Sequence, residues 1–336
     1  MRALTTLLFG AIALTVSGAL PASAQPPIKI RVSWVAPVSN WASIMLEKKE
    51  LAQHLGKSYT MEAVRYAGTP PMVTALASGE LEIANLAYST LAIAIKNAGL
   101  DDLRVVGDQF RDGEGGYYSN QYFVLADSPI RTVEDLKGKV LATNVAGSAV
   151  DIAMRAMLRK HALEDRRDYT VVEAPFPTMK AMLVQSKADL VPFVAPFAFD
   201  PEVAQVGRQL FSQREAIGPT QMIVWVAHAD FLRKNRAAML DFMEDAVRVV
   251  RWYLDPNNHD AAVAIAAKIT KLPPERFANW LFTNKEYARS PDLIPDLKAL
   301  QSNIDVQREL GFLKGPIEVE KYADLSIVRE AAQRLR

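Results

Sequence analysis

The stretch YAGTPPMVTALASGELEIANLAYST, residues 66–90, decides the fold of this chain. It predicts a strand end, a tight turn at Gly68-Thr69, a short helix, and a second strand over residues 81–86. A polar loop is expected after that strand, at Tyr88-Ser89-Thr90. Thr69 is a favourable N-cap, and the prolines that follow it suit the first helical positions, where a missing N–H costs little. Helix N-termini attract anions, and open α/β sheets bind ligands where their strands end, so this stretch predicts one wall of a ligand site.

Residues 68–72 (Gly-Thr-Pro-Pro-Met) and 75–84 resemble the first-lobe signature of substrate-binding proteins of ABC importers, nearest to the nitrate/sulfonate/taurine branch. Asp-Leu-Lys-Gly-Lys-Val at 135–140, and the tail from 309–312 to 321–325, resemble the same family. The resemblance implies a type II two-lobed periplasmic binding protein, an α/β fold in which each lobe is a mixed sheet flanked by helices. It also implies hinge closure over a small organic ligand and an inner-membrane ABC permease as partner. We expect no cofactor.

The N-terminus predicts an export signal. Arg2 precedes an apolar run over residues 7–16, and Ala22-Ser23-Ala24 is a small-residue cleavage site. A membrane anchor is the weaker alternative, because a span needs roughly 20 apolar residues. We therefore expect a signal peptide over residues 1–24, cleavage near Ala24, and a periplasmic protein.

The composition limits the partners of the chain. There is no cysteine, which excludes disulfides, thiol chemistry and a lipid-anchored signal. The 39 basic and 38 acidic residues are interspersed, and loss of Arg2 with the signal makes the two counts equal. A nucleic-acid partner would need a basic patch, so none is expected, and we expect a monomer.

Strands and helices alternate through the first two thirds of the chain. A glycine-rich and aromatic segment at 111–121 and an apolar strand at 221–227 interrupt this pattern and predict two crossovers between lobes. We therefore expect lobe 1 to be discontinuous, over residues 28–118 and 225–336, with lobe 2 over residues 119–224. Among the expected helices are residues 41–54, 178–185, 274–282 and 295–310, together with an amphipathic helix around residues 240–254.

No residue pattern predicts catalysis or metal binding. The four histidines lack ligand partners at helical or hairpin spacing. Ser148 follows Gly147 but lacks the glycine of a nucleophile elbow two residues later, so it is better explained as a helix N-cap. We expect no catalytic residue and no metal site.

The predicted ligand contacts lie on loops at strand ends and include the starts of two helices, one in each lobe, which would face each other across a closed cleft. They are Asn40, Trp41, Thr69, Tyr88, Ser89, Tyr118, Asn144, Gly147, Ser148, Phe176 and Phe197. None of these loops carries Lys or Arg, and a phosphate or dicarboxylate site would more often use Arg, for bidentate bonding. Neutral donors beside aromatic rings favour a singly charged head on an apolar body.

We therefore expect the substrate-binding component of an ABC uptake system for a small organic anion, of the alkylsulfonate or aromatic carboxylate type. Three alternatives stay open at this point. The first is a binder of an uncharged heterocycle such as a thiamine pyrimidine precursor. The second is an enzyme on the same scaffold, which the lack of cysteine and clustered histidine disfavours. The third is a periplasmic sensor subunit with the same fold.

Overall fold

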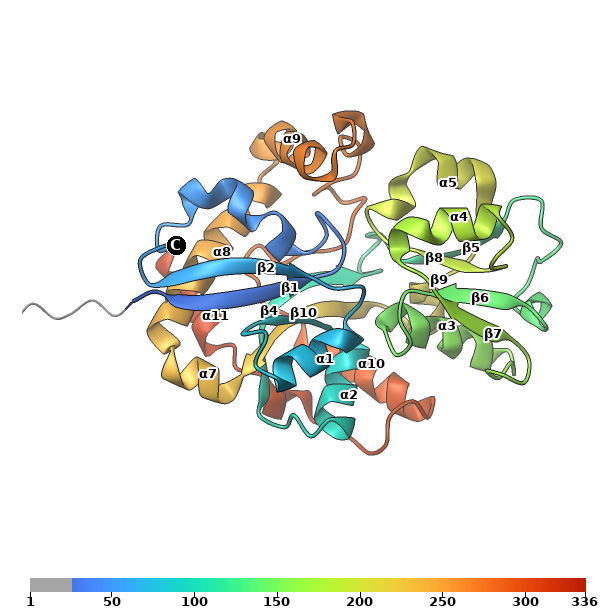
Figure 1. Cartoon of the computed structure of the whole chain (residues 1–336), viewed down its shortest axis with the longest axis horizontal. Helices are drawn as coiled ribbons and strands as arrows, with labels where there is room; N and C mark the ends of the chain where they lie inside the picture. The colour runs from blue at the N-terminus through green and yellow to red at the C-terminus, as the bar shows by residue number, and fades with distance from the viewer. Residues whose placement is uncertain (1–25) are drawn as a thin grey trace, which may run out of the picture.

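The structure, a computed structural model, describes residues 26–336 of the chain. Figure 1 shows two bodies side by side. The first body holds the elements before residue 113 and after residue 219, and the second body holds the elements between them. The predicted signal peptide lies outside the described residues.

A mixed sheet forms the centre of the first body. Its strands are β1 (Ile28–Trp34), β2 (Tyr59–Arg65), β3 (Ala84–Ala87), β4 (Leu103–Asp112) and β10 (Thr220–His228). β1 and β2 are parallel, and a parallel bridge from Val32 to Ile83 connects β1 to the segment before β3. β10 lies between β3 and β4 and is antiparallel to both, so the chain returns to the first sheet through β10.

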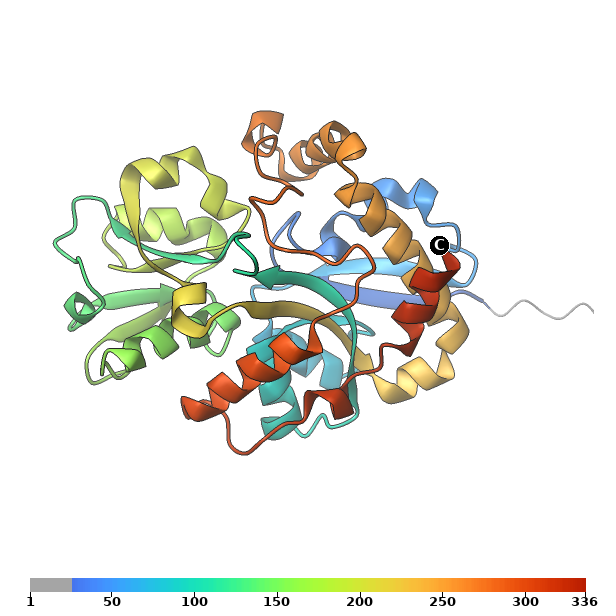
Figure 2. The ribbon, with the colours of Figure 1, turned by 180° about the vertical axis from the view of Figure 1, so that it is seen from behind.

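Helices cover both faces of this first sheet. They are α1 (Pro70–Ala77), α2 (Tyr88–Asn97), α7 (Ala229–Lys234), α8 (Arg236–Leu254), α9 (His259–Thr270), α10 (Leu297–Glu309) and α11 (Ser326–Arg334). The apolar face predicted for α8 is buried at Met243, Val247 and Val250, each 0% exposed. Seen from behind, α10 and α11 lie on the first body, so the C-terminal segment completes it (Figure 2).

The second body repeats this plan on a smaller scale. Its strands are β5 (Gln121–Leu125), β6 (Val140–Thr143), β7 (Thr170–Glu173), β8 (Val191–Phe193) and β9 (Gly207–Ser212). β5 is antiparallel to β8 and β9, whereas β6 and β7 are parallel, and a bridge from Leu141 to Leu190 connects the two sets. The helices are α3 (Ala149–Lys160), α4 (Met179–Val184), α5 (Pro201–Val206) and α6 (Gln213–Ile217). Mixed sheets flanked by helices in both bodies confirm the predicted α/β class.

The helix predicted over residues 41–54 is wrong. The segment forms two 3₁₀ stretches, Trp41–Ser43 and Met45–Leu51, and Lys48 has non-helical angles. The reason is competition for backbone groups, because the N–H groups of Gln53 and His54 donate to the Asp245 carboxylate, each at 2.9 Å. These bonds to α8 replace the last helical turn.

The polar loop predicted at residues 88–90 is also wrong, since these residues form the first turn of α2. Their side chains are buried, and the Thr90 hydroxyl pairs with that of Thr69 at 2.6 Å. The sequence pattern had placed these polar side chains in solvent. In the structure they are buried, and Thr90 finds its hydrogen-bond partner inside the protein.

Two further differences concern short elements. Only Pro274–Arg276 of the helix expected over residues 274–282 is regular, as a 3₁₀ turn. The sequence interpretation also missed β9 and α6. A signal for α6 exists, because Ser212 and Glu215 form a capping box in which each side chain bonds the other residue's backbone N–H.

Candidate functional site

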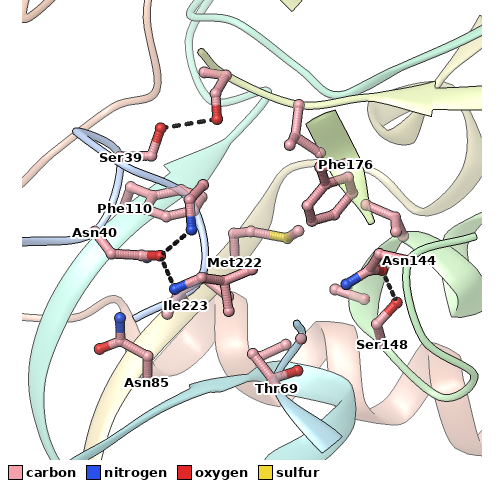
Figure 3. A pocket seen from close by; sticks show the side chains of 18 of the residues that line it. Ser39, Asn40, Thr69, Asn85, Phe110, Asn144, Ser148, Phe176, Met222 and Ile223 are labelled. Atoms are coloured by element: carbon pink, nitrogen blue, oxygen red, sulfur yellow. Dashed lines mark hydrogen bonds between the residues drawn. The ribbon is translucent and has the colours of Figure 1, made fainter. Parts of the chain in front are cut away.

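A cavity lies between the two bodies (Figure 3), and its empty space of about 500 Å³ includes part of the solvent at its opening. We call its sides the first wall and the second wall. The first wall is the loop at residues 35–40, the turn Gly68-Thr69, and Asn85 of β3. The second wall is the segment 144–150, of which Asn144 and residues 148–150 line the cavity, together with Phe176, Val194 and Ala195. Ala87, Phe110, Met222, Ile223 and Tyr287 complete the lining. None of the lining side chains in the described part of the chain is charged.

The loop of the first wall is shaped by Asn40 and Ser39. The Asn40 side-chain oxygen accepts hydrogen bonds from the backbone N–H groups of Val35 at 2.9 Å and Ala36 at 3.0 Å. The Ser39 hydroxyl donates to the Ala195 carbonyl at 2.9 Å. This loop is therefore held in a fixed shape and bonded to the second wall.

The turn of the first wall offers fewer donors than its sequence predicted. Thr69 makes no side-chain cap bond to α1, because its hydroxyl pairs with that of Thr90. Pro70 and Pro71 open the helix without N–H groups, so the expected donor set at this helix start is largely missing. Gly68 is required for another reason: a Cβ there would lie 2.8 Å from Asn144 Nδ2 and from Val145 Cγ2. The turn therefore packs directly against the second wall.

The second wall is built around the start of α3. Ser148 caps this helix as predicted, accepting from the Asp151 N–H at 3.4 Å, and its hydroxyl donates to Asn144 Oδ1 at 2.7 Å. Asn144 Nδ2 donates across the cavity to the Ala67 carbonyl at 3.2 Å. The first N–H groups of an α-helix have no intrahelical acceptor, so those of Ala149 and Val150, which line the cavity, are available to a ligand.

Asn85 is a polar side chain of the lining that the sequence interpretation missed. It lies in β3, is 0% exposed, and lines the cavity. Within residues 26–336 neither its Nδ2 nor its Oδ1 has a hydrogen-bond partner. A buried polar group left unpaired costs about 1–3 kcal/mol. The only signal in the sequence was an asparagine inside an otherwise apolar strand.

A buried ion pair supports the first wall from behind. Arg289 and Glu286 pair with side chains 2% and 0% exposed. Arg289 Nη1 donates to the carbonyls of Ser39 and Gln109, both at 3.1 Å, and its guanidinium lies 4.6 Å from the ring centre of Trp41. Because Glu286 balances the charge, this arginine positions the loop without making the cavity cationic.

The structure brings five of the predicted site residues to the cavity: Asn40, Thr69, Asn144, Ser148 and Phe176. The other six do not line it, and most have structural partners. Trp41 stacks on Phe282 with ring centres 5.6 Å apart. The hydroxyls of Tyr88, Ser89 and Tyr118 bond carbonyls of Ala149, Gly147 and Phe193 at 3.5, 3.1 and 2.8 Å. Burial raises the pKa of Tyr88 and of Tyr118, so both stay neutral donors.

Phe197, the last of these six, lines a second and larger cleft with about 1140 Å³ of empty space, part of it open to solvent. Phe176 lines both spaces and therefore separates the inner cavity from the cleft. The cleft carries charged side chains, among them Arg65 over the ring of Trp34 at 5.2 Å and Lys180 paired with Asp200 at 2.9 Å. The positively charged side chains Arg65 and Lys180 thus lie in the cleft and outside the inner cavity.

The segments that connect the two bodies hold buried acids. Asp112, at the end of β4, accepts from the Ser119 hydroxyl at 2.6 Å and the Asn120 N–H at 2.7 Å. Burial raises the pKa of Asp112 to about 7, and that of Asp108 to about 6. Asn120 Oδ1 also accepts from the Tyr287 hydroxyl at 2.5 Å, which links this crossover to the cavity lining.

Two kinds of feature are absent from the described residues. No cluster of three or more His, Cys, Asp or Glu side chains could hold a metal ion. No helix there is both long and apolar enough to span a membrane.

Solved structures with the same fold include periplasmic binding proteins and an enzyme. The aliphatic sulphonate binding protein SsuA of Escherichia coli is 18% identical, with a TM-score of 0.64 over 89% of this chain and 92% of that one. The nitrate-binding protein NrtA of Synechocystis PCC 6803 is 16% identical, with a TM-score of 0.69 over 93% and 90%. The desulfurization enzyme DSZB is 15% identical, with a TM-score of 0.64 over 92% and 100%.

These likenesses define the class of the molecule by its fold, which is that of the two-lobed periplasmic binding proteins. The chain belongs to the NMT1-like family, whose model matches residues 23–267. The family resemblance predicted from the sequence is thus confirmed. No curated protein sequence matches the chain. Since DSZB shares the scaffold, the fold alone does not separate a binding protein from an enzyme.

Proposed function

We propose that this protein is the periplasmic substrate-binding component of an ABC uptake system and captures a small organic anion between its two lobes. The anion has a single charged head on an apolar body, as in an alkylsulfonate or an aromatic carboxylate. The observation that carries the proposal is the inner cavity, which is lined by apolar side chains and neutral donors and by contributions from both bodies.

The start of α3 is the proposed place for the anionic head. Ala149 and Val150 line the cavity there, their N–H groups belong to the first turn, which has no intrahelical acceptors, and a helix N-terminus favours negative charge. The Asp151 carboxylate in the same turn is paired with Arg155 at 2.9 Å, so it does not bring an uncompensated negative charge. Phe110, Phe176, Met222 and Ile223 would surround the apolar body.

Hinge closure would couple binding to transport. Direct bonds between the bodies, such as Ser39 to Ala195 at 2.9 Å and Ser89 to Gly147 at 3.1 Å, form only when the walls are close. A ligand shifts such an equilibrium by its preference for the closed form, which contacts to both walls would supply. The moving bodies in this proposal are residues 28–118 with 225–336, and residues 119–224, and the permease would bind the closed form.

A thermal-shift screen of the mature protein tests the ligand class. The panel contains alkylsulfonates, taurine, benzoates, nitrate and hydroxymethylpyrimidine. Ligand at 100 times its dissociation constant stabilises the folded state by about 2.7 kcal/mol, so a hit raises Tm by several degrees. We expect hits among sulfonates or benzoates; a shift with hydroxymethylpyrimidine alone, or with nothing, would contradict the proposed anion.

A further inference from the structure

Almost every polar side chain of the inner cavity already has a protein partner. Ser148 and Asn144 bond each other at 2.7 Å, and the Thr69 hydroxyl pairs with Thr90 at 2.6 Å. Ser39 donates to Ala195 at 2.9 Å, and Tyr287 donates to Asn120 at 2.5 Å. These groups already bond to protein atoms within a wall or between the walls, so they discriminate poorly between ligands.

Asn85 is the exception in this lining. Its amide is buried, and both of its polar atoms lack a protein partner within residues 26–336. Its backbone N–H donates to the Ser33 hydroxyl at 2.8 Å, which fixes the residue in β3. In Figure 3 Asn85 lies on the side of the cavity away from Asn144 and Ser148. A ligand that reaches from α3 across the cavity would therefore meet Asn85 with its other end.

A carboxamide side chain offers one donor group, the NH₂, and one acceptor, the carbonyl oxygen, side by side on the same carbon. A sulfonate, carboxylate or ketone presents acceptors only and would leave Asn85 Oδ1 unpaired. The edge of a primary amide or a lactam presents an acceptor and a donor side by side and would pair with both atoms. Sites built to hydrogen-bond a substrate group reject analogues that lack it far more strongly than apolar pockets do.

We propose that Asn85 is the specificity-determining residue of the cavity and selects ligands whose inner end carries an amide-like edge. This inference rests on the proposed function, because it names the ligand chemistry of the same cavity. The anionic head lies against α3, the apolar body fills the centre, and the amide edge forms two hydrogen bonds with Asn85.

A purely structural role makes a different prediction. Trp225 stands opposite Asn85 in the register of β10 and β3, and its Nε1 also lacks a partner within the described residues. If Asn85 served mainly to bond this indole, its replacement would lower stability and would change the affinity of all probes equally. The experiment must therefore measure selectivity between matched probes.

The probes are 4-carbamoylbenzoate and 4-acetylbenzoate, which have nearly the same shape and differ by an NH₂ in place of a methyl group. Titration calorimetry on the wild-type protein is expected to give at least tenfold tighter binding of the carbamoyl compound. Asn85→Leu should reduce this ratio to about one. Thr143→Val is the matched control. It removes another buried polar group that has no partner in the described part of the chain, but Thr143 does not line the cavity, so the ratio should be unchanged.

The uncharged pair benzamide and acetophenone separates this inference from the proposed function. If only this pair binds and the wild-type protein prefers benzamide, the anionic ligand class fails and the role of Asn85 stands. Equal affinities within both pairs, a preference that survives in Asn85→Leu, or no binding of any of the four probes would overturn the role of Asn85.

Discussion

The two walls of the cavity differ in how they use their polar groups. On the second wall, Asn144 and Ser148 bond each other, and Asn144 also bonds the first body. On the first wall, Asn85 keeps both amide atoms without a partner among residues 26–336, and the loop is supported from behind by Arg289 and Glu286. The second wall is therefore suited to holding the closed shape, whereas the first wall is suited to selecting the ligand.

The largest expected effect concerns the support of the first wall. Arg289→Ala removes one partner of a buried ion pair and should lower the free energy of unfolding by about 3–5 kcal/mol, because the Glu286 charge is left uncompensated. Denaturant unfolding of the purified variant measures this loss.

Arg233→Ala is the matched control for that variant. Arg233 and Asp230 have the same i,i+3 spacing as the buried pair, but their side chains are 73% and 60% exposed. Exposed pairs contribute about 0–1 kcal/mol, so this variant should be nearly as stable as the wild type. Equal losses in the two variants would mean that Arg289 does not support the wall as described.

The next effect belongs to neither wall but to the crossover between the bodies. Burial raises the pKa of Asp112 to about 7, so the folded state keeps this proton at pH values where the unfolded state has released it. The contribution of Asp112 to stability is thus complete below about pH 4 and is lost as pH rises toward 7, at about 1.4 kcal/mol for each unit of pKa difference.

Asp112→Asn isolates this contribution, because asparagine does not titrate while Asp108 still does. We expect the unfolding free energy of the wild type minus that of Asp112→Asn to fall between pH 5 and pH 8. Denaturant unfolding at both pH values measures it. A difference that stays constant with pH, or rises, would show that Asp112 is already ionised in the folded protein.

A smaller effect tests the contact between the walls directly. A Cβ at Gly68 would lie 2.8 Å from Asn144 Nδ2 and Val145 Cγ2, so Gly68→Ala should disfavour the closed form. Overpacking of this kind costs about 1–3 kcal/mol, which corresponds to roughly 5- to 150-fold weaker ligand binding. Calorimetry with a compound found in the thermal-shift screen measures the change.

Val145→Ala added to Gly68→Ala should restore part of the lost affinity, since it removes one of the two clashing atoms. Unchanged affinity in the single variant would mean that the walls do not need to meet when ligand binds.

The smallest effect separates capping from ligand contact on the second wall. Ser148→Ala should cost about 1 kcal/mol of stability through loss of the α3 cap, and should also weaken ligand binding. Ser212→Ala removes the cap of α6 away from the cavity and should cost a similar amount with binding unchanged. Parallel loss of binding in both variants would remove Ser148 from the proposed site.

The sequence predicted the features that depend on local pattern. The α/β alternation, the amphipathic face of α8 and the Ser148 cap follow from residue spacing and from capping chemistry, and all three are present. Five of the predicted contacts reached the cavity because they lie at strand ends or helix starts, where backbone direction alone determines the side of the sheet.

The missed features depend on contacts between distant segments. Trp41 and Tyr88 face the core because Phe282 and the α3 segment pack on them, and nothing near either residue in the sequence indicates this. Arg289 comes from a segment 250 residues after the carbonyl of Ser39 that it bonds. Asn85 differs from an ordinary buried asparagine only because its side chain has no hydrogen-bond partner within residues 26–336. A sequence gives no information on such a missing partner.

The most direct test of the central claim, closure of the two bodies over a ligand, is a distance between them in solution. Because the chain has no cysteine, Ala77→Cys with Lys187→Cys places spin labels at one exposed position in each body. Pulsed electron paramagnetic resonance should give a broader and longer distance distribution without ligand than with a compound that calorimetry shows to bind. An unchanged distribution at saturating ligand would contradict hinge closure.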